Sequence, residues 1–291
     1  MAALAGRHLL LFGPGYVARA VAGLAQSQGA RVSAVLRDPS RADAMRASGV
    51  VPVLAGTGDR LTGAVLEGVT DLLISAPPLA GGCPALAALG GQVPPGVIWA
   101  GYYSSTAVYG DCGGDWIDES RAPAPVSADA RARLIAEAEW QDVAARQGVA
   151  LDILRIAGIY GPEGRNVLAQ LRGGQARAIL KPGQVFNRIH RDDIAAATLA
   201  ALASPDGLRL TNLADGAPSA ASDLLAGVAA MLGLPAPPEV AFGDAGLPPA
   251  AAGFYAENRR IRPDRLLALP GFALRYPDWR AGYAGMIAAG E

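Results

Sequence analysis

The sequence predicts an α/β protein with a doubly wound, parallel Rossmann sheet and a smaller C-terminal cap region. Short apolar runs alternate with helical stretches through the first two-thirds of the chain, a pattern typical of βαβ units. A glycine-rich turn directly follows the first apolar run, as in dinucleotide-binding sheets. The alternation stops near residue 216, and loops rich in Gly, Pro and Ala follow residue 232.

The apolar runs are the expected strands of the sheet. Each is short and is bounded by Gly, Pro or polar residues, which end strands. The predicted strands are 8–12, 31–36, 50–54, 71–75, 97–103, 151–155 and 209–213.

Helices are expected to connect these strands. The predicted helices are 17–28, one opened by Pro39 at its first position, 127–147, 193–203 and 219–232. Leu134, Ala138 and Val143 form the predicted apolar side of the 127–147 helix. Asp192 or Asp193 is the expected N-cap of the 193–203 helix.

We expect the chain to be divided into two regions. The Rossmann domain spans residues 1–159 and is completed by about 187–232, whereas 160–186 and 233–291 form the cap. Open α/β sheets bind ligands at the carboxyl edge of their strands. The cap is expected to cover that edge.

Composition narrows the classes of function. The 291 residues carry a formal net charge of −1, so there is no electrostatic reason to expect nucleic acid or an anionic membrane as a partner. The two cysteines, Cys83 and Cys112, are typical of a reducing compartment without disulfides. No apolar run has the length of a signal segment or a membrane span, and no cluster has metal-ligand spacing. We expect a soluble, cytoplasmic protein.

The first turn has the features of a phosphate-binding loop. Gly13 permits a tight turn, and Gly15 lets the backbone approach a pyrophosphate because it has no Cβ. Ala18 is small enough for the helix to pack closely on the strand. The helix that starts near Tyr16 and Val17 offers N–H groups and positive partial charge. The loop predicts a dinucleotide site.

The end of the second strand distinguishes the two nicotinamide cofactors. Enzymes that use NAD usually have Asp or Glu there for the ribose 2′-hydroxyl, but this chain has Leu36. Arg37 and Arg41 follow, and a guanidinium group suits a 2′-phosphate. Asp38 is a rival acid, and both arginines are also readable as solvated loop residues. The sequence favours NADP, with NAD as the alternative.

Four further segments carry a family resemblance. They are YSSTAVYGD (103–111), RIAGIYGP (155–162), IHRDDI (189–194) and TNLADG (211–216). With the phosphate loop they stand in family order, and together the chain resembles the extended short-chain dehydrogenase/reductases, the NAD(P)-dependent epimerase/dehydratase family. The resemblance implies a nicotinamide near Ala157, Gly158 and Ile159. Ala76 and Pro77, which follow the fourth strand, are also expected in the cofactor site.

The chain departs from this family at the catalytic pair. The family's acid/base is a Tyr followed four residues later by Lys, but the only lysine, Lys181, has Arg177 at that spacing. Glu137 resembles the acid on the family's catalytic helix. Counting back from it, Arg133 stands in the lysine position and Asp129 in the tyrosine position.

The candidate catalytic residues are therefore Ser105, Asp129 and Arg133. The resemblance implies that the Ser105 hydroxyl bonds a substrate oxygen, although it is also readable as a strand-end cap. Arg133 can hold a ribose or phosphate but does not lose a proton near neutral pH. Asp129 is also readable as a first-turn acid favoured by the helix dipole. Other groups that remain open as substitutes are Tyr102, Tyr103, Tyr109, Tyr160, Tyr255 and His190.

Two functions follow from these residues. One is an NADP-dependent reductase or epimerase-like enzyme that acts on a small molecule with a hydroxyl or carbonyl group. The other is a non-catalytic NADP-binding redox sensor or regulatory protein. The missing Tyr-Lys pair favours the sensor, whereas Ser105 and the cap favour the enzyme. The sequence leaves open the substrate, the reaction direction and the oligomeric state, including whether the protein is a homodimer.

Overall fold

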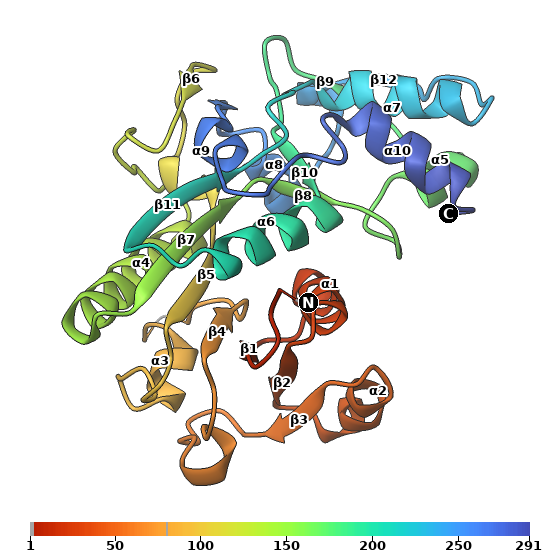
Figure 1. The fold of residues 1–291 in the computed structure, drawn as a ribbon. Helices are drawn as coiled ribbons and strands as arrows, with labels where there is room; N and C mark the ends of the chain where they lie inside the picture. Colours follow the sequence, from red (N-terminus) through yellow and green to blue (C-terminus); the bar gives the residue numbers. More distant parts are fainter. Residues whose placement is uncertain (1–2, 80) are drawn as a thin grey trace.

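A computed structural model describes residues 3–79 and 81–291, and its centre is a seven-stranded parallel sheet (Figure 1). The strand order is β11-β7-β5-β4-β1-β2-β3. It reverses between β1 and β4, the kind of switch point at which doubly wound sheets bind ligands. The strands are β1 His8–Phe12, β2 Arg31–Leu36, β3 Val51–Leu54, β4 Asp71–Ile74, β5 Trp99–Ser105, β7 Ala150–Ile156 and β11 Leu208–Leu213. The predicted fold class is confirmed.

Helices cover both faces of this sheet (Figure 1). On one face lie α1 (Tyr16–Ser27), α2 (Ala42–Ala47) and α6 (Arg191–Ala203), and on the other α3 (Pro84–Ala88) and α4 (Ala128–Gln147). Alternate residues of β1 therefore enter different cores: Leu9 and Leu11 pack with α1, whereas Leu10 packs on the opposite face. Burial on both faces explains why the strands are continuous apolar runs.

The cap contains short elements beyond the carboxyl edge of the sheet (Figure 1). Its strands form parallel pairs of two: β8 (Gly158–Tyr160) with β10 (Arg188–His190), β9 (Ala178–Leu180) with β12 (Glu239–Ala241), and β6 (Trp116–Ile117) with β13 (Arg260–Ile261). Its helices are α5 Leu168–Arg172, α7 Ala221–Met231, α8 Pro249–Gly253, α9 Asp264–Leu267 and α10 Trp279–Ala288.

A separate apolar cluster holds much of the cap together. It includes Tyr160 from β8, Leu168 from α5, Val228 from α7 and Trp279 from α10. Helix α7, which the sequence groups with the Rossmann domain, thus packs in the cap's own core. Within the described residues, no helix combines the length and apolar character needed to cross a membrane.

The buried side of α4 differs from the prediction. Val143 is buried as expected, but Leu134 is only half-buried and Ala138 is exposed. The buried side instead centres on Glu137 and Trp140. A pattern of apolar residues misses this side because Glu137, a charged residue, is neutralised inside the protein by an ion pair.

The predicted N-cap of α6 is wrong. The cap is His190, whose Nδ1 accepts a hydrogen bond from the backbone N–H of Asp192 at 3.2 Å. Asp193 is buried and its carboxylate accepts the backbone N–H groups of Arg275 and Tyr276, at 2.8 and 3.1 Å. Because this carboxylate holds a distant loop, it does not cap its own helix.

Candidate functional site

A cleft of about 330 Å³ lies at the carboxyl edge of the sheet, beside the switch point. This volume is within the range of small-molecule sites, about 300–1,000 Å³. The cleft is lined by residues that follow β1 and β4, by residues at the carboxyl ends of β5 and β7 and just beyond β7, by α4 and by the cap. They are Gly15, Tyr16, Val17, Ser75, Tyr103, Ser104, Ser105, Arg133, Ile156, Ala157, Ile159 and Arg165.

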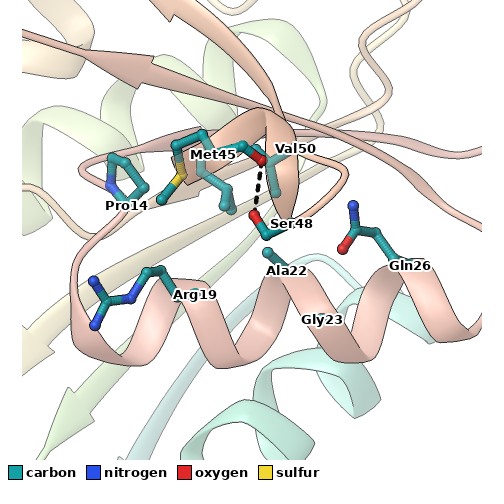
Figure 2. Close-up of a pocket in the computed structure, with 9 residues that line it drawn as sticks. Pro14, Arg19, Ala22, Gly23, Gln26, Met45, Ser48 and Val50 are labelled. Atoms are coloured by element: carbon teal, nitrogen blue, oxygen red, sulfur yellow. Dashed lines mark hydrogen bonds between the residues drawn. The ribbon is translucent and has the colours of Figure 1, made fainter. Parts of the chain in front are cut away.

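A second, smaller cavity of about 110 Å³ lies between α1 and the segment from α2 to β3 (Figure 2). Its lining includes Pro14, Ala22, Met45 and Val50. This cavity is smaller than typical small-molecule sites and is mostly apolar. The larger cleft is therefore the candidate functional site.

The two glycines of the first loop have different structural roles. Gly13 has φ +81°, and a Cβ there would lie 2.7 Å from the backbone nitrogen of Ala76, so only glycine fits. A Cβ on Gly15 would meet nothing closer than 3.9 Å, so the space beside it is open. Helix α1 starts at Tyr16 without a side-chain cap, and the N–H groups of its first turn have no helical partner. This open, uncapped loop fits a phosphate group.

One arginine lies against this loop. The Nη2 of Arg41 donates a hydrogen bond to the carbonyl oxygen of Pro14 at 3.0 Å. Arg37 is exposed. Of the two arginines that follow β2, Arg41 is therefore held directly beside the phosphate loop.

The two other residues at the end of β2 have structural contacts. Leu36 is buried in the core. The Asp38 carboxylate accepts hydrogen bonds from the Ser40 hydroxyl at 2.7 Å and from the Ser40 backbone N–H at 3.0 Å. These bonds from Ser40 lower the pKa of Asp38. The rival acid is thus engaged in capping a 3₁₀ turn.

The structure brings Ser105 and Arg133 to the cleft but leaves Asp129 outside its lining. Ser105 is half-buried, and its Oγ accepts the backbone N–H of Ala107 at 3.2 Å. Arg133 is half-buried and donates from Nη1 to the Tyr103 carbonyl oxygen at 3.0 Å. Asp129 is exposed in the first turn of α4.

A buried ion pair supports this wall of the cleft. Arg155 donates to the Glu137 carboxylate from Nε at 3.0 Å and from Nη2 at 2.6 Å. The Ser104 hydroxyl donates to the same carboxylate at 2.5 Å. Arg155 also lies over the Tyr109 ring, and the Tyr109 hydroxyl donates to Asn212 at 2.8 Å. Because both oxygens of the Glu137 carboxylate are bonded to Arg155, the charges of this pair compensate each other inside the protein.

The remaining predicted cofactor residues fall into two groups. Ala157 and Ile159 line the cleft together with Tyr16 and Val17. The others lie outside the lining: Ala18 is on the buried side of α1, Ala76 packs behind Gly13, and Gly158 and Pro77 are exposed.

The tyrosines proposed as substitute acids do not present their hydroxyls to the cleft. Only Tyr103 lines it, and its hydroxyl is hydrogen-bonded to Thr198 at 2.7 Å. Burial raises the pKa of Tyr103, so its phenol stays protonated near neutral pH. The Tyr160 hydroxyl donates to the Asp278 carbonyl, and Tyr255 packs against other aromatic rings in the cap.

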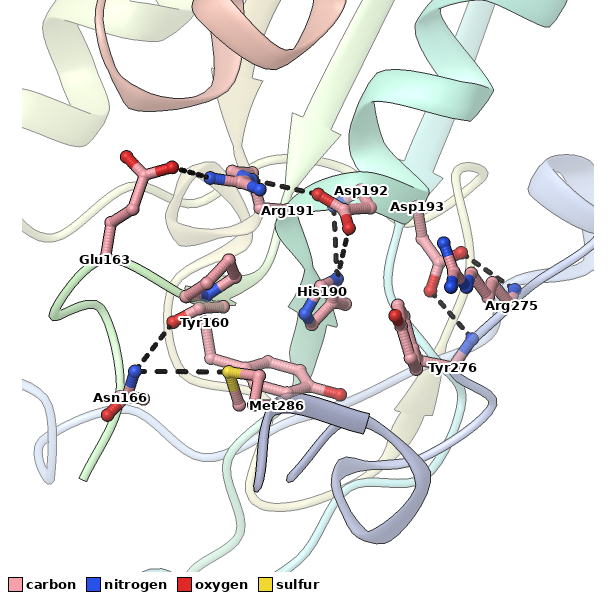
Figure 3. A network of polar contacts seen from close by, with 12 residues as sticks. Tyr160, Glu163, Asn166, His190, Arg191, Asp192, Asp193, Arg275, Tyr276 and Met286 are labelled. Atoms are coloured by element: carbon pink, nitrogen blue, oxygen red, sulfur yellow. Dashed lines mark hydrogen bonds and ion pairs between the residues drawn. The ribbon is translucent and has the colours of Figure 1, made fainter. Parts of the chain in front are cut away.

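His190 is part of a buried network between the cap and α6 (Figure 3). Its ring contacts Tyr160 and Tyr276, with ring centroids 5.2 and 4.1 Å apart. Burial lowers the pKa of His190 to about 4, so the ring is neutral near pH 7. His190 does not line the cleft and is held by structural contacts.

Sequence reasoning missed Arg165. It belongs to residues 161–167, here called the strap, which connect β8 to α5. The Tyr16 hydroxyl donates to the Pro162 carbonyl at 2.7 Å, and the Arg165 guanidinium lies 5.6 Å from the centroid of the Tyr16 ring. No spacing rule identifies a residue in such a loop. The only available signal is that the strap directly follows the Tyr-Gly-Pro motif.

Comparisons with known proteins agree with this architecture. The model of the NAD dependent epimerase/dehydratase family matches residues 97–213, from β5 to β11. A search of curated proteins finds no significant match.

Several solved structures resemble the chain along its length. A functionally unknown conserved protein from Silicibacter pomeroyi DSS is 44% identical, with a TM-score of 0.89; the match covers 97% of this chain and 99% of that one. MoeE5, solved with UDP-glucose and NAD, is 20% identical with a TM-score of 0.76, covering 97% of each chain. The human epimerase family protein SDR39U1, solved with NADPH, is 17% identical with a TM-score of 0.74, covering 97% and 99%. Residues 97–213 of the chain therefore match the NAD dependent epimerase/dehydratase family, and the whole chain shares the fold of these solved structures.

Proposed function

We propose that the chain binds NADP in preference to NAD in this cleft, and that it is a reductase or epimerase-like enzyme acting on a small molecule with a hydroxyl or carbonyl group. The observation that carries the proposal is the open side of Gly15 at the uncapped start of α1, beside the switch point of the sheet. Similar structures were solved with NADPH in SDR39U1 and with NAD in MoeE5.

The residues after β2 support the preference for NADP. Arg41 lies beside the phosphate loop and retains donors after its bond to Pro14. Leu36 provides no acid for a ribose 2′-hydroxyl, and the Asp38 carboxylate is bonded to Ser40. A 2′-phosphate would therefore meet a guanidinium group and no unengaged acid.

The chain's own groups then define the chemistry. When bound, the cofactor supplies hydride transfer. The first turn of α1 binds the pyrophosphate, and Arg133 holds the ribose or a phosphate near the end of β5. Ser105 Oγ accepts from the Ala107 N–H, so its own proton is free to be donated to a substrate hydroxyl or carbonyl oxygen.

One observation favours a second candidate, a non-catalytic NADP-binding sensor. Among the described residues that line the cleft, none carries a carboxyl, imidazole or amine group. Burial raises the pKa of Tyr16 to about 12, and its hydroxyl is bonded to Pro162. A group that exchanges a proton near neutral pH is thus missing from this lining. Loss of a positioned acid or base lowers the rate of catalysis by a factor of about 10²–10⁴.

Three measurements test these functions. Calorimetric titration should detect binding of NADPH, and sugar nucleotides, aldehydes and ketones should be assayed both for NADPH oxidation and for product, because an epimerisation consumes no net NADPH. Protease sensitivity of the cap is compared with and without cofactor. Turnover of any of these compounds supports the enzyme. Binding without turnover, together with a cofactor-dependent change in protease sensitivity of the cap, supports the sensor. Failure to bind either NADPH or NADH contradicts both.

A further inference from the structure

The strap is fixed across the start of α1 by several contacts. The Tyr16 hydroxyl of α1 donates to the Pro162 carbonyl at 2.7 Å. The Glu163 carboxylate pairs with Arg191 at 2.8 Å and lies 3.6 Å from Arg19 of α1. Pro162 and Glu163 therefore hold the first part of the strap against α1 and the start of α6, before any ligand is considered.

Two arginines lie near the same tyrosine ring but differ in their pairing. The guanidinium carbons of Arg191 and Arg165 are 5.1 and 5.6 Å from the Tyr16 ring centroid. Arg191 is neutralised by Asp192 at 2.9 Å and by Glu163 at 2.8 Å. Within residues 3–79 and 81–291, the exposed Arg165 guanidinium has no hydrogen-bond or ion-pair partner. Of the two, only Arg165 lines the cleft.

The charge of the cleft is also unbalanced. Its described lining contains the cations Arg133 and Arg165 and no carboxylate. Arg133 donates to the Tyr103 carbonyl beside β5, whereas Arg165 lies near the loop that starts α1. The dipole of α1 offers the equivalent of about half a positive charge. A pyrophosphate carries two negative charges, so a cation beside the helix start would add to the attraction that the dipole provides.

We propose that Arg165 binds the pyrophosphate of the dinucleotide, so that the cap contributes directly to cofactor binding. The proposal rests on the proposed function. A planar guanidinium pairs with phosphate oxygens through two parallel N–H groups, and the anchored strap reduces the entropy lost when this bond forms. The Arg165 guanidinium lies over the Tyr16 ring, 5.6 Å from its centroid, and this contact leaves its N–H donors available for the phosphate.

The test compares two ligands that differ in the pyrophosphate. NADPH contains both the pyrophosphate and the 2′-phosphate, whereas adenosine 2′-phosphate contains only the latter. Arg165→Ala should weaken NADPH binding about tenfold in calorimetry and leave adenosine 2′-phosphate binding unchanged. The difference should shrink in high salt, because Arg165 is exposed. Arg165→Lys, which keeps the charge but not the planar fork, should recover part of the loss.

Arg146→Ala is the matched control. Arg146 is also an exposed arginine, but its guanidinium pairs with Asp142 at 2.5 Å within α4 and lies outside the cleft lining. It should change NADPH affinity much less than Arg165→Ala. An unchanged NADPH affinity in Arg165→Ala, or an equal loss for both ligands, would overturn the proposal while leaving cofactor binding intact. If the unmodified protein binds no NADPH, the proposed function itself is wrong.

A protection experiment provides an independent readout on the unmodified protein. Trypsin cleaves after exposed arginines, so the Arg165–Asn166 bond in the strap is a candidate cleavage site. NADPH should slow cleavage at this bond, and adenosine 2′-phosphate should not. Equal cleavage rates with both ligands, under conditions where each saturates the protein, would contradict a bond between Arg165 and the pyrophosphate.

Discussion

The Arg41 guanidinium donates a hydrogen bond to the Pro14 carbonyl oxygen at 3.0 Å, which holds a residue of the β2–α2 connection beside the phosphate loop. The contact brings a positive charge next to residues that lie 27 positions earlier in the chain. A cofactor phosphate near this loop would meet that charge.

This relationship predicts the effect of removing Arg41. NADPH should bind more tightly than NADH by about 1–3 kcal/mol, the contribution of one charge-assisted contact. Arg41→Ala should abolish most of this preference by weakening NADPH binding alone, and calorimetry with both cofactors measures it. Arg37→Ala is the control for a nearby exposed charge. A native preference for NADH would contradict the prediction and indicate Asp38 as the ribose ligand.

The two loop glycines should respond differently to substitution. Gly15 has φ −82° and open space beside it, so Gly15→Val should leave the melting temperature nearly unchanged but block cofactor binding. Gly13→Ala should lower stability, because its positive φ and the close backbone of Ala76 oppose any side chain. Calorimetry and thermal unfolding separate the two effects. Normal NADPH binding by a folded Gly15→Val protein would show that the loop is not the phosphate site.

If the protein is an enzyme, Ser105→Ala should lower kcat while NADPH affinity stays nearly constant. The reason is that Ser105 lines the cleft, and the variant loses a donor to the substrate oxygen together with the acceptor for the Ala107 N–H. Steady-state kinetics with calorimetry on the same protein provides the comparison. Robust turnover by Ser105→Ala would mean that the chemistry depends on another group.

Arg133 and Asp129 should play unequal parts. Arg133→Ala should weaken cofactor binding, because its guanidinium is at the cleft wall. Asp129→Asn should change neither affinity nor turnover, since Asp129 is exposed outside the lining. Titration and turnover assays of the two variants form a matched test of the residues that the sequence predicts at the family's Lys and Tyr positions. A large loss of turnover in Asp129→Asn would restore it as a catalytic candidate.

Asp215 should make stability depend on pH. Burial raises its pKa to about 7, and its Oδ2 has no hydrogen-bond partner among the described residues. Between the unfolded pKa of about 3.9 and 7, the folded state binds the extra proton, so stability falls as pH rises. The loss should reach roughly 4 kcal/mol at most.

Asp215→Asn should remove this dependence while preserving the bond from the Ala217 N–H to Oδ1. Urea unfolding at pH 5 and pH 8 measures the free energy of unfolding of both proteins. The difference between them isolates Asp215 from His190, whose lowered pKa acts in the opposite direction below pH 6.5. An identical pH dependence in both proteins would contradict a raised pKa at Asp215.

Local patterns in the sequence were sufficient for the strands and the first loop. The predicted bounds of β1 and β2 agree with the structure, because runs of apolar residues buried on both faces are a strong local signal. β5 begins and ends two residues later than predicted, since flanking apolar residues blur the boundary of a strand. The motif at Gly13 and Gly15 similarly depends on neighbours within a few residues.

Tertiary structure alone decided which charged residues are buried, which of them hold distant segments, and which can bind a ligand in the cleft. Glu137 lies on the inner side of α4 because Arg155, 18 residues later, neutralises it, and Asp193 serves a loop 82 residues away instead of its own helix. Arg165 meets Tyr16 across almost 150 residues of chain through the strap. Such contacts depend on where distant segments pack, so they cannot be predicted from the residues that neighbour a side chain in the sequence. The sequence determined the sheet and its phosphate loop; packing of the cap decided which arginine reaches the cleft.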